Sequence, residues 1–303
     1  MKNLLLFLVV LLVGGCALFD DQSTPEGYVR HCVRQLDKRA LYAGTKEWKA
    51  KKDSILHVLS DLPDMDAARV LVSEAANVAG GKHSRLVPPV KDTASYIEHL
   101  PEVKLIEDGI AYILLPEHMG VKVSDSLYVY TVLDFLRDNQ EASGVVVDLR
   151  GNTGGNMYHM ISALSPLLPD GIVLKFKGPK FTTPLTLSFI MKVARIPVHG
   201  IGKFQVPVAI LTDDWTASSG EATLLCFRGL DNVRTFGIPT AGYASANMVH
   251  ALADGYSLLI TTSCDEARTG EVFCDDPIAP DVTTDTPLED AVSWILSAKA
   301  VTR

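Results

Sequence analysis

Two adjacent serines stand between an apolar strand and a helix, a position where a hydroxyl can become a nucleophile. The segment Thr216-Ala-Ser-Ser-Gly-Glu221 follows the apolar run Val206-Pro-Val-Ala-Ile-Leu211, and the pattern predicts a helix from Ser218 to Arg228. Free N–H groups at a helix start can stabilise a developing oxyanion, as they bind other anions. The alternative is that the serines only cap the helix.

A glycine-rich turn offers a second source of N–H groups. It belongs to Asp148-Leu-Arg-Gly-Asn-Thr-Gly-Gly155, which ends another apolar strand. Glycine allows a positive φ and a close approach of the backbone to a substrate oxygen. A phosphate-binding loop would need a Lys-Ser/Thr pair after the glycines, but Asn156-Met157 stands there. The turn therefore suits an oxyanion better than a nucleotide, with an ordinary strand-to-helix turn as the alternative.

Four motifs, taken in order, resemble those of the S41 family of serine peptidases, which contains the carboxyl-terminal processing proteases and the tricorn core protease. They are Gly80-Gly-Lys-His-Ser84, Asp148–Gly155, Thr216–Glu221 together with Phe236-Gly-Ile-Pro-Thr-Ala-Gly242, and Pro277-Ile-Ala-Pro-Asp281. The resemblance runs from Asn77 to the end of the chain. It implies an α/β fold, with a layered, crotonase-like core of β-sheet and helix, and hydrolysis of peptide bonds in a peptide or protein substrate.

The resemblance also implies catalytic roles by position. The family nucleophile lies three residues before the acidic residue of its motif, which is Glu221, and so corresponds to Ser218. The N–H of Ser219, with one from Gly154 or Gly155, would form the oxyanion hole. Glu221 itself is left with a structural role.

The sequence differs from the processing proteases at the residue that acts as their general base. Their Gly-x-Pro-Thr-x-Gly-Lys lysine is replaced by Tyr243, and a phenol with a pKa near ~10 is a poor base at neutral pH. The tricorn-like branch uses a histidine from an N-terminal segment, which the resemblance places at His83. His118 is the alternative base. Asp275 or Asp276 would orient the imidazole, and the sequence does not choose between them. Asp276 is taken as the third catalytic residue, with Ser218 and His83.

The N-terminus predicts export and lipid attachment. A lysine and a short apolar run precede Val13-Gly-Gly-Cys16, which resembles a bacterial lipobox. We expect residues 1–15 to be a lipoprotein signal peptide, Cys16 to carry the lipid anchor, and 16–25 to be a tether. Ala17 after the cysteine favours the outer membrane, facing the periplasm. An uncleaved anchor is the alternative.

The charge and the cysteine content of the chain limit which binding partners and cofactors are expected. The net charge of −8 over 303 residues argues against nucleic acid and against a broad electrostatic membrane patch, so attachment would rest on the lipid. The expected chemistry requires no metal or organic cofactor, and no cysteine pair has metal-ligand spacing. Export favours a disulfide between Cys264 and Cys274 across a predicted hairpin, while Cys32 and Cys226 fit buried thiols.

The hydrophobic pattern divides the chain into a helical region at 26–85 and a catalytic core at 86–303. A hairpin at 103–115 turns at Asp108-Gly109. Residues 171–205 look like a long irregular insertion, a lid or an interface, with elements packed on the core as the alternative. The other expected elements are helices at 26–41, 45–62, 64–78, 124–139, 156–168 and 288–300, and strands at 145–149, 206–211, 233–236, 247–252 and 256–262.

The spacing also excludes one module of the processing proteases. Many of them insert a PDZ domain before the core, but the short stretch from Ser84 to Val103 cannot hold a domain. Two functions of different classes remain. The first is a lipid-anchored serine peptidase, and the second is a binding protein for peptides or hydrophobic ligands built on a retired protease scaffold.

Overall fold

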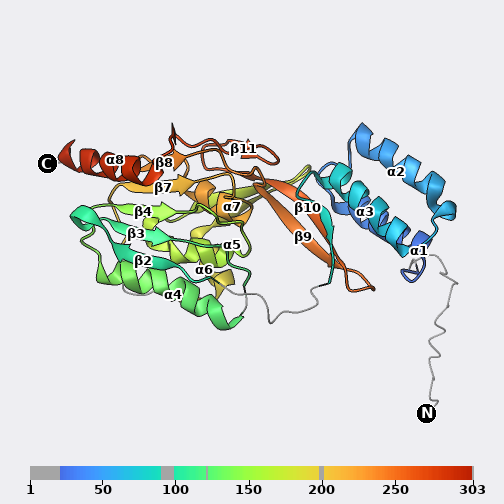
Figure 1. Cartoon of the computed structure of the whole chain (residues 1–303), viewed down its shortest axis with the longest axis horizontal. Helices are drawn as coiled ribbons and strands as arrows, with labels where there is room; N and C mark the ends of the chain where they lie inside the picture. Colours follow the sequence, from blue (N-terminus) through green and yellow to red (C-terminus); the bar gives the residue numbers. More distant parts are fainter. Residues whose placement is uncertain (1–20, 90–98, 121, 198–200, 302–303) are drawn as a thin grey trace, which may run out of the picture.

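The computed structural model describes residues 21–89, 99–120, 122–197 and 201–301. Within them, helices pack against two six-stranded sheets (Figure 1). The strands are β1 (Arg85–Val87), β2 (Glu102–Leu105), β3 (Ala111–Leu114), β4 (Val145–Asp148), β5 (Ile172–Lys177), β6 (Thr182–Thr186), β7 (Val208–Thr212), β8 (Val233–Gly237), β9 (Ser245–Ala251), β10 (Ser257–Glu266), β11 (Val272–Phe273) and β12 (Val282–Thr283). The α-helices are α1 (Pro25–Arg39), α2 (Lys46–Val58), α3 (Met65–Gly80), α4 (Lys122–Asp138), α5 (Met157–Ala163), α6 (Leu187–Ala194), α7 (Ser219–Phe227) and α8 (Pro287–Val301), and the short 3-10 helices are η1 (Leu59–Asp61), η3 (Glu107–Gly109) and η4 (Ser165–Leu167).

The core sheet, which positions the site, has the order β12-β8-β7-β4-β3-β2. Its strands are parallel except β2, which pairs antiparallel with β3 through the predicted hairpin. Every residue of β4 and β7 is buried, as their apolar runs predict for strands covered on both faces. Asp148 lies opposite Leu211, so the loops that follow these two strands leave the same edge of the sheet side by side.

Helices cover both faces of this sheet. Val145 and Val147 point to the face packed by α4, α5 and α7, and Val146 points to the other face, against α8. Figure 1 shows α8 along one side of the sheet and α4 to α6 along the other. The layered α/β core expected from the sequence is confirmed.

The second sheet connects the core to the helical region. Its order is β1-β10-β5-β6, with β9 and β11 also paired to β10. The long β9–β10 ribbon reaches from the core to α1, α2 and α3 (Figure 1). Leu258 and Ile260 of β10 share an apolar cluster with Trp48 of α2. The helical region is therefore fixed to the sheet by hydrophobic packing.

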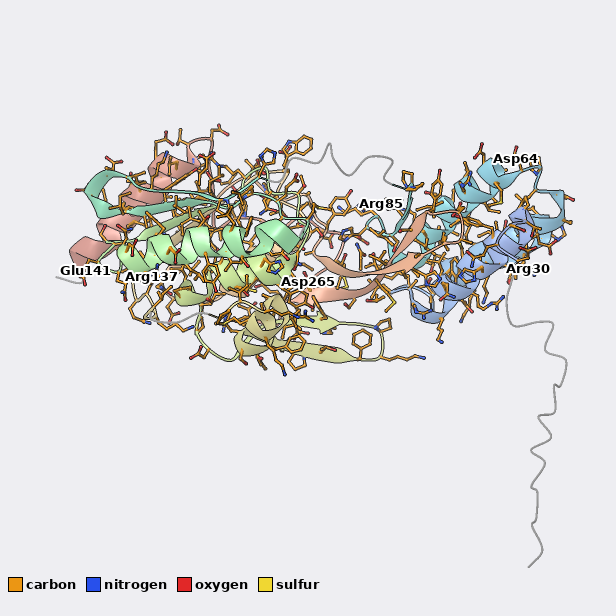
Figure 2. The ribbon with its side chains drawn as sticks, turned by 90° about the horizontal axis from the view of Figure 1, so that it is seen from below. Arg30, Asp64, Arg85, Arg137, Glu141 and Asp265 are labelled. Carbon is orange, nitrogen blue, oxygen red and sulfur yellow. A yellow bond between two sulfur atoms is a disulfide. The ribbon has the colours of Figure 1, made fainter. Side chains whose placement is uncertain are left out.

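The helix starts in this region follow the sequence signals. The side chains of Thr45 and Asp64 accept N–H groups from the first turns of α2 and α3, as predicted. Figure 2 shows Arg30 and Asp64 at this end of the molecule, Arg137 at the far end of α4, and Arg85 between them.

The insertion at 171–205 differs from the irregular segment predicted. It forms β5, β6 and α6, and β5 pairs with β10. Leu185, Leu187 and Ile190 are buried against the core, which explains why this apolar stretch folds back rather than remaining a loop. The alternative, elements packed on the core, is the one observed.

The predicted disulfide between Cys264 and Cys274 is confirmed, with 4.7 Å between the two Cα atoms. Cys32 and Cys226 are buried free thiols. None of the helices within the described residues has the length and apolar character needed to cross a membrane. The signal peptide at 1–15 and the lipid site at Cys16 lie outside the described residues.

Candidate active site

Ser218 stands at the start of α7 in an unusual backbone conformation. Its φ of 52° and ψ of −115° lie outside the regions that L-residues favour, so the surrounding contacts must hold it there. Two bonds tie the preceding residues to the loop after β4: Thr216 Oγ1 donates to the Leu149 carbonyl at 2.9 Å, and Ala217 N–H donates to the Asn152 carbonyl at 2.9 Å. The half-buried Ser218 and Glu221 form a capping box, in which the Ser218 side chain faces the N–H of Glu221. Among the described residues the Ser218 hydroxyl donates no hydrogen bond, so its proton is available to a base.

The glycine turn after β4 lies against Ser218. A Cβ at Gly154 would come within 2.8 Å of the Ser218 Cβ, which explains the need for glycine there. Ser219 Oγ donates to the Gly155 carbonyl at 2.6 Å and so fastens the turn to α7. Gly154 N–H donates to Asn152 Oδ1 at 2.9 Å, but in the described part of the chain no acceptor meets the N–H of Ser219 or Gly155. Of the two glycines left open by the sequence, Gly155 therefore has the available N–H.

His83 is buried, with 6% of its surface exposed. Its Nδ1 lies 2.9 Å from Ser245 Oγ, and its ring meets the Tyr243 ring edge to face at 5.3 Å between centroids. Burial, aided by the positive charges of Arg85 and Lys82, lowers the pKa of His83 to about 4. The imidazole is therefore neutral at neutral pH, the form that can accept a proton.

Glu221 connects the histidine side of the site to the serine side. Its Oε2 accepts the N–H of Ser218 at 2.9 Å and that of Tyr243 at 2.7 Å. Tyr243 packs on His83, so one carboxylate oxygen holds both the serine and the residue that packs on the histidine. Among the described residues, no hydrogen bond joins His83 directly to Ser218. Such bonds are often long without substrate and tighten when it binds.

The acid predicted to orient His83 is not its hydrogen-bond partner. Asp276 is exposed, and Asp275 Oδ2 accepts the Tyr42 hydroxyl at 3.1 Å instead. Ser245 fills the place against the imidazole. It lies at the start of β9, 162 residues from His83, and the pairing of both β9 and β1 with β10 brings it there. A single serine at a strand start gives no sequence signal for this role.

Lys82 brings an amine to the segment where processing proteases keep their lysine. Its Nζ donates to the Ala241 carbonyl at 3.0 Å and lies 4.5 Å from the centroid of the Tyr243 ring. The missing lysine at position 243 is visible in the sequence, but the placement of the Lys82 amine beside Tyr243 is not. The only available signal was the position of Lys82 next to His83 within the same motif.

The alternative base, His118, faces another part of the molecule. Its Nε2 lies 3.0 Å from Asp125 Oδ1 and 3.2 Å from His159 Nδ1, between α4 and α5. Its backbone meets the glycine turn through a bridge to Gly155. The contacts therefore favour His83 over His118 as the base.

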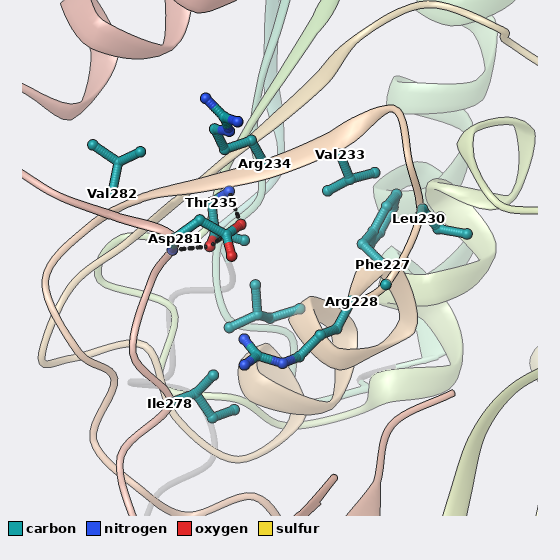
Figure 3. A pocket seen from close by; sticks show the side chains of 11 residues that line it. Phe227, Arg228, Leu230, Val233, Arg234, Thr235, Ile278, Asp281 and Val282 are labelled. Carbon is teal, nitrogen blue, oxygen red and sulfur yellow. Dashed lines mark hydrogen bonds between the residues drawn. The ribbon is translucent and has the colours of Figure 1, made fainter. Parts of the chain in front are cut away.

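A pocket of about 480 Å³ opens at the opposite end of α7 (Figure 3). Phe227 and Arg228 line it at the helix end, and Asp281 lines it from the segment before β12. At 1.5 Å per residue, Phe227 at this end of α7 lies roughly 13–14 Å along the helix axis from Ser218. The pocket is therefore not the place where the serine hydroxyl would act.

We expect Glu221→Ala to destabilise the protein strongly. The buried carboxylate also accepts Gly242 N–H and the Thr240 hydroxyl, so its loss leaves several buried donors unsatisfied. The expected fall in the free energy of unfolding is about 3–5 kcal/mol, measured by urea denaturation. Glu271→Ala is the matched control, because its pair with Arg228 is partly exposed and worth about 1 kcal/mol or less. Equal effects of the two substitutions would contradict this role of Glu221.

Comparison with known proteins identifies the family. The model of peptidase family S41 matches residues 109–284, and the chain belongs to this family. The matched range contains Ser218, Gly154 and Gly155, whereas His83 precedes it.

Two relatives resemble nearly the whole chain. A nisin-resistance protein from Lactococcus lactis subsp. lactis is 33% identical over 281 residues, which cover 90% of this chain and 88% of that protein. The structure of a lipoprotein from Streptococcus agalactiae is 32% identical, with a TM-score of 0.81 over 91% of this chain and 97% of its own. The photosystem II D1 C-terminal processing protease shares the fold, with a TM-score of 0.63 and 12% identity over 89% of this chain and 97% of its own.

Proposed function

We propose that the protein is a serine peptidase in which Ser218 is the nucleophile. The observation that carries this proposal is the Ser218 hydroxyl at the strained start of α7, which donates no hydrogen bond among the described residues and lies beside the available N–H groups of Ser219 and Gly155. A tetrahedral intermediate needs its oxyanion to meet such donors. Membership of family S41 supports the same conclusion.

His83 is the proposed general base. When Nδ1 donates to Ser245 Oγ, the lone pair is on Nε2, which takes the proton as Ser218 Oγ attacks the peptide carbonyl. The same proton then passes to the departing amine as the C–N bond breaks. Water, deprotonated by His83, hydrolyses the acyl-enzyme and releases the acid product. Ser245 acts in this scheme as a positioning residue for the ring.

The proposed substrates are peptides at the cell envelope. One relative is named for nisin resistance and another is described as a lipoprotein, which supports a peptide such as nisin as the first substrate to test. A lipid on Cys16 would hold the enzyme at a membrane surface. The proposal keeps the anchor at Cys16 and does not rest on the outer membrane suggested by Ala17.

Mass spectrometry of nisin incubated with the purified protein tests this function. We expect fragments whose masses add to that of the intact peptide plus one water, and no fragments with Ser218→Ala. Intact nisin after prolonged incubation, together with intact peptides in a diverse library, would reject the peptidase proposal.

A second candidate is a peptide-binding protein without catalysis. Two observations favour it: Tyr243 stands where processing proteases keep lysine, and no direct hydrogen bond joins His83 to Ser218 among the described residues. In this case nisin would bind the wild type and Ser218→Ala with equal affinity, and neither protein would release fragments.

The depressed pKa of His83 predicts the acid limb of activity. Protonation removes the lone pair, so kcat/KM should stay level from neutral pH into the mildly acidic range and fall as the pH drops through about 4. Initial rates between pH 3 and pH 8, with tryptophan fluorescence to follow folding, measure this limb. A limb near the ordinary histidine pKa of ~6.5 would show that the base is a solvated histidine instead.

A further inference from the structure

Three side chains with metal-binding atoms converge between the core helices. His118 lies in the segment after β3, Asp125 in the first turn of α4, and His159 on α5. His118 Nε2 is 3.0 Å from Asp125 Oδ1 and 3.2 Å from His159 Nδ1, and the last two atoms are 3.6 Å apart. The serine site uses none of these side chains.

The triangle formed by His118 Nε2, Asp125 Oδ1 and His159 Nδ1 has the size of one face of a tetrahedral metal site. Zinc binds histidine nitrogen and carboxylate oxygen at about 2.0–2.2 Å, which places neighbouring ligand atoms about 3.3–3.6 Å apart in a tetrahedron. Two of the observed separations, 3.0 and 3.2 Å, are slightly shorter than this, and the third, 3.6 Å, matches its upper end. An ion would therefore need only small movements of the side chains.

Protons alone satisfy this triangle poorly. One proton on His118 Nε2 can bridge to Asp125, but the His159 Nδ1 lone pair then has no donor of its own. A second proton on His159 Nδ1 turns two N–H groups toward each other across 3.2 Å. A divalent cation would accept a lone pair from all three atoms at once.

The surroundings suit a bound ion with one free position. The His118 side chain is fully buried and stacks on the Tyr128 ring, with 4.3 Å between centroids, which fixes its direction. The Asp125 side chain is 20% exposed, so a water molecule can reach the fourth position from that side. Two imidazoles and one carboxylate are ligands that zinc and its neighbours in the transition series prefer.

We propose that His118, Asp125 and His159 bind one divalent transition-metal ion, with Zn²⁺ as the preferred ion and water as the fourth ligand. The other two ligands lie 7 and 41 residues from His118 and neither is a cysteine, so cysteine spacing in the sequence does not indicate this site.

The ion would join the helix layer to the glycine turn. His118 N–H donates to the Gly154 carbonyl at 3.0 Å, and Asn156 N–H donates to the His118 carbonyl at 2.5 Å. Fixing the His118 ring would thereby fix the backbone that carries Gly154 and Gly155. This coupling rests on the proposed peptidase function, whereas metal binding itself does not.

Isothermal titration of chelator-treated protein with zinc chloride tests the site, with metal content after dialysis measured by mass spectrometry. We expect one Zn²⁺ per chain and a loss of affinity of about 100-fold or more in Asp125→Asn and in His159→Gln, judged against the 10–100-fold cost of removing an outer-shell partner. His250→Gln is the matched control, because its imidazole pairs with His31 elsewhere and its loss should leave zinc binding unchanged.

Two results would overturn the proposal: no stoichiometric binding by the wild type, or full binding by both Asp125→Asn and His159→Gln. Thermal melts of each variant without metal establish that it is folded, and binding is compared only among folded variants. Ser218→Ala should bind zinc as the wild type does. If the protein cleaves peptides but does not bind zinc, only the metal site is wrong. If it binds zinc but does not cleave peptides, only the peptidase proposal is wrong.

Discussion

Replacing Ser218 with alanine should reduce kcat/KM for peptide hydrolysis by about 10⁵–10⁶-fold, as expected when a serine nucleophile is removed. The substitution removes the only atom proposed to bond to the substrate carbonyl. It should leave the fold intact, because the backbone N–H of Ser218 still donates to Glu221. Steady-state rates with a fluorogenic peptide derived from the nisin fragments, and thermal melts of both proteins, measure the two effects.

Ser219→Ala is the matched control for the nucleophile. It removes the neighbouring hydroxyl but keeps the N–H proposed for the oxyanion hole. Its hydroxyl fastens the Gly155 carbonyl to α7, so we expect a smaller loss of about 10–100-fold from a shifted donor. If Ser219→Ala were inactive and Ser218→Ala active, the assignment of the nucleophile would be reversed.

His83→Ala should have the second largest effect, a fall in kcat/KM of about 10⁴-fold or more. Without the imidazole, nothing removes the proton from Ser218 as it attacks. His83 lies against Ser245 and Tyr243, so the smaller side chain leaves a cavity and some loss of stability is expected. Rates are therefore compared at a temperature where melts show both proteins to be folded.

The substitution Lys82→Met tests whether the general base is His83 or Lys82. The Lys82 amine lies near Tyr243 and could in principle replace the lysine of the processing proteases. The His83 proposal predicts a modest effect of Lys82→Met, within about tenfold, together with a raised acid limb because one of the positive charges that depress the pKa of His83 is gone. If Lys82→Met were inactive while His83→Ala kept its activity, the base would be the lysine.

Much of the fold could be predicted because local signals agreed with the final packing. The apolar runs at β4 and β7 required strands buried on both faces, and the sheet provides that environment. Asp108-Gly109 gave the turn of the first hairpin, where both residues have positive φ. Thr45 and Asp64 began helices because their side chains accept N–H groups from the first turn.

What the sequence did not reveal depends on contacts between distant segments. Ser245 reaches His83 because β9 and β1 both pair with β10, and Lys82 reaches Tyr243 across 161 residues of chain. Asp276 was expected beside the base because a neighbouring motif matched, yet its side chain is exposed. Nothing in the sequence distinguishes His159 from the other seven histidines, and only the fold shows that it lies next to His118.

The most direct test of the central claim is to map the adduct of a fluorophosphonate probe, which bonds covalently to activated serines. The account predicts one adduct per chain, on the peptide that contains Ser218, with labelling lost in Ser218→Ala and greatly slowed in His83→Ala. An unlabelled wild type, or an adduct on any other residue, would contradict the claim that Ser218 is an activated nucleophile.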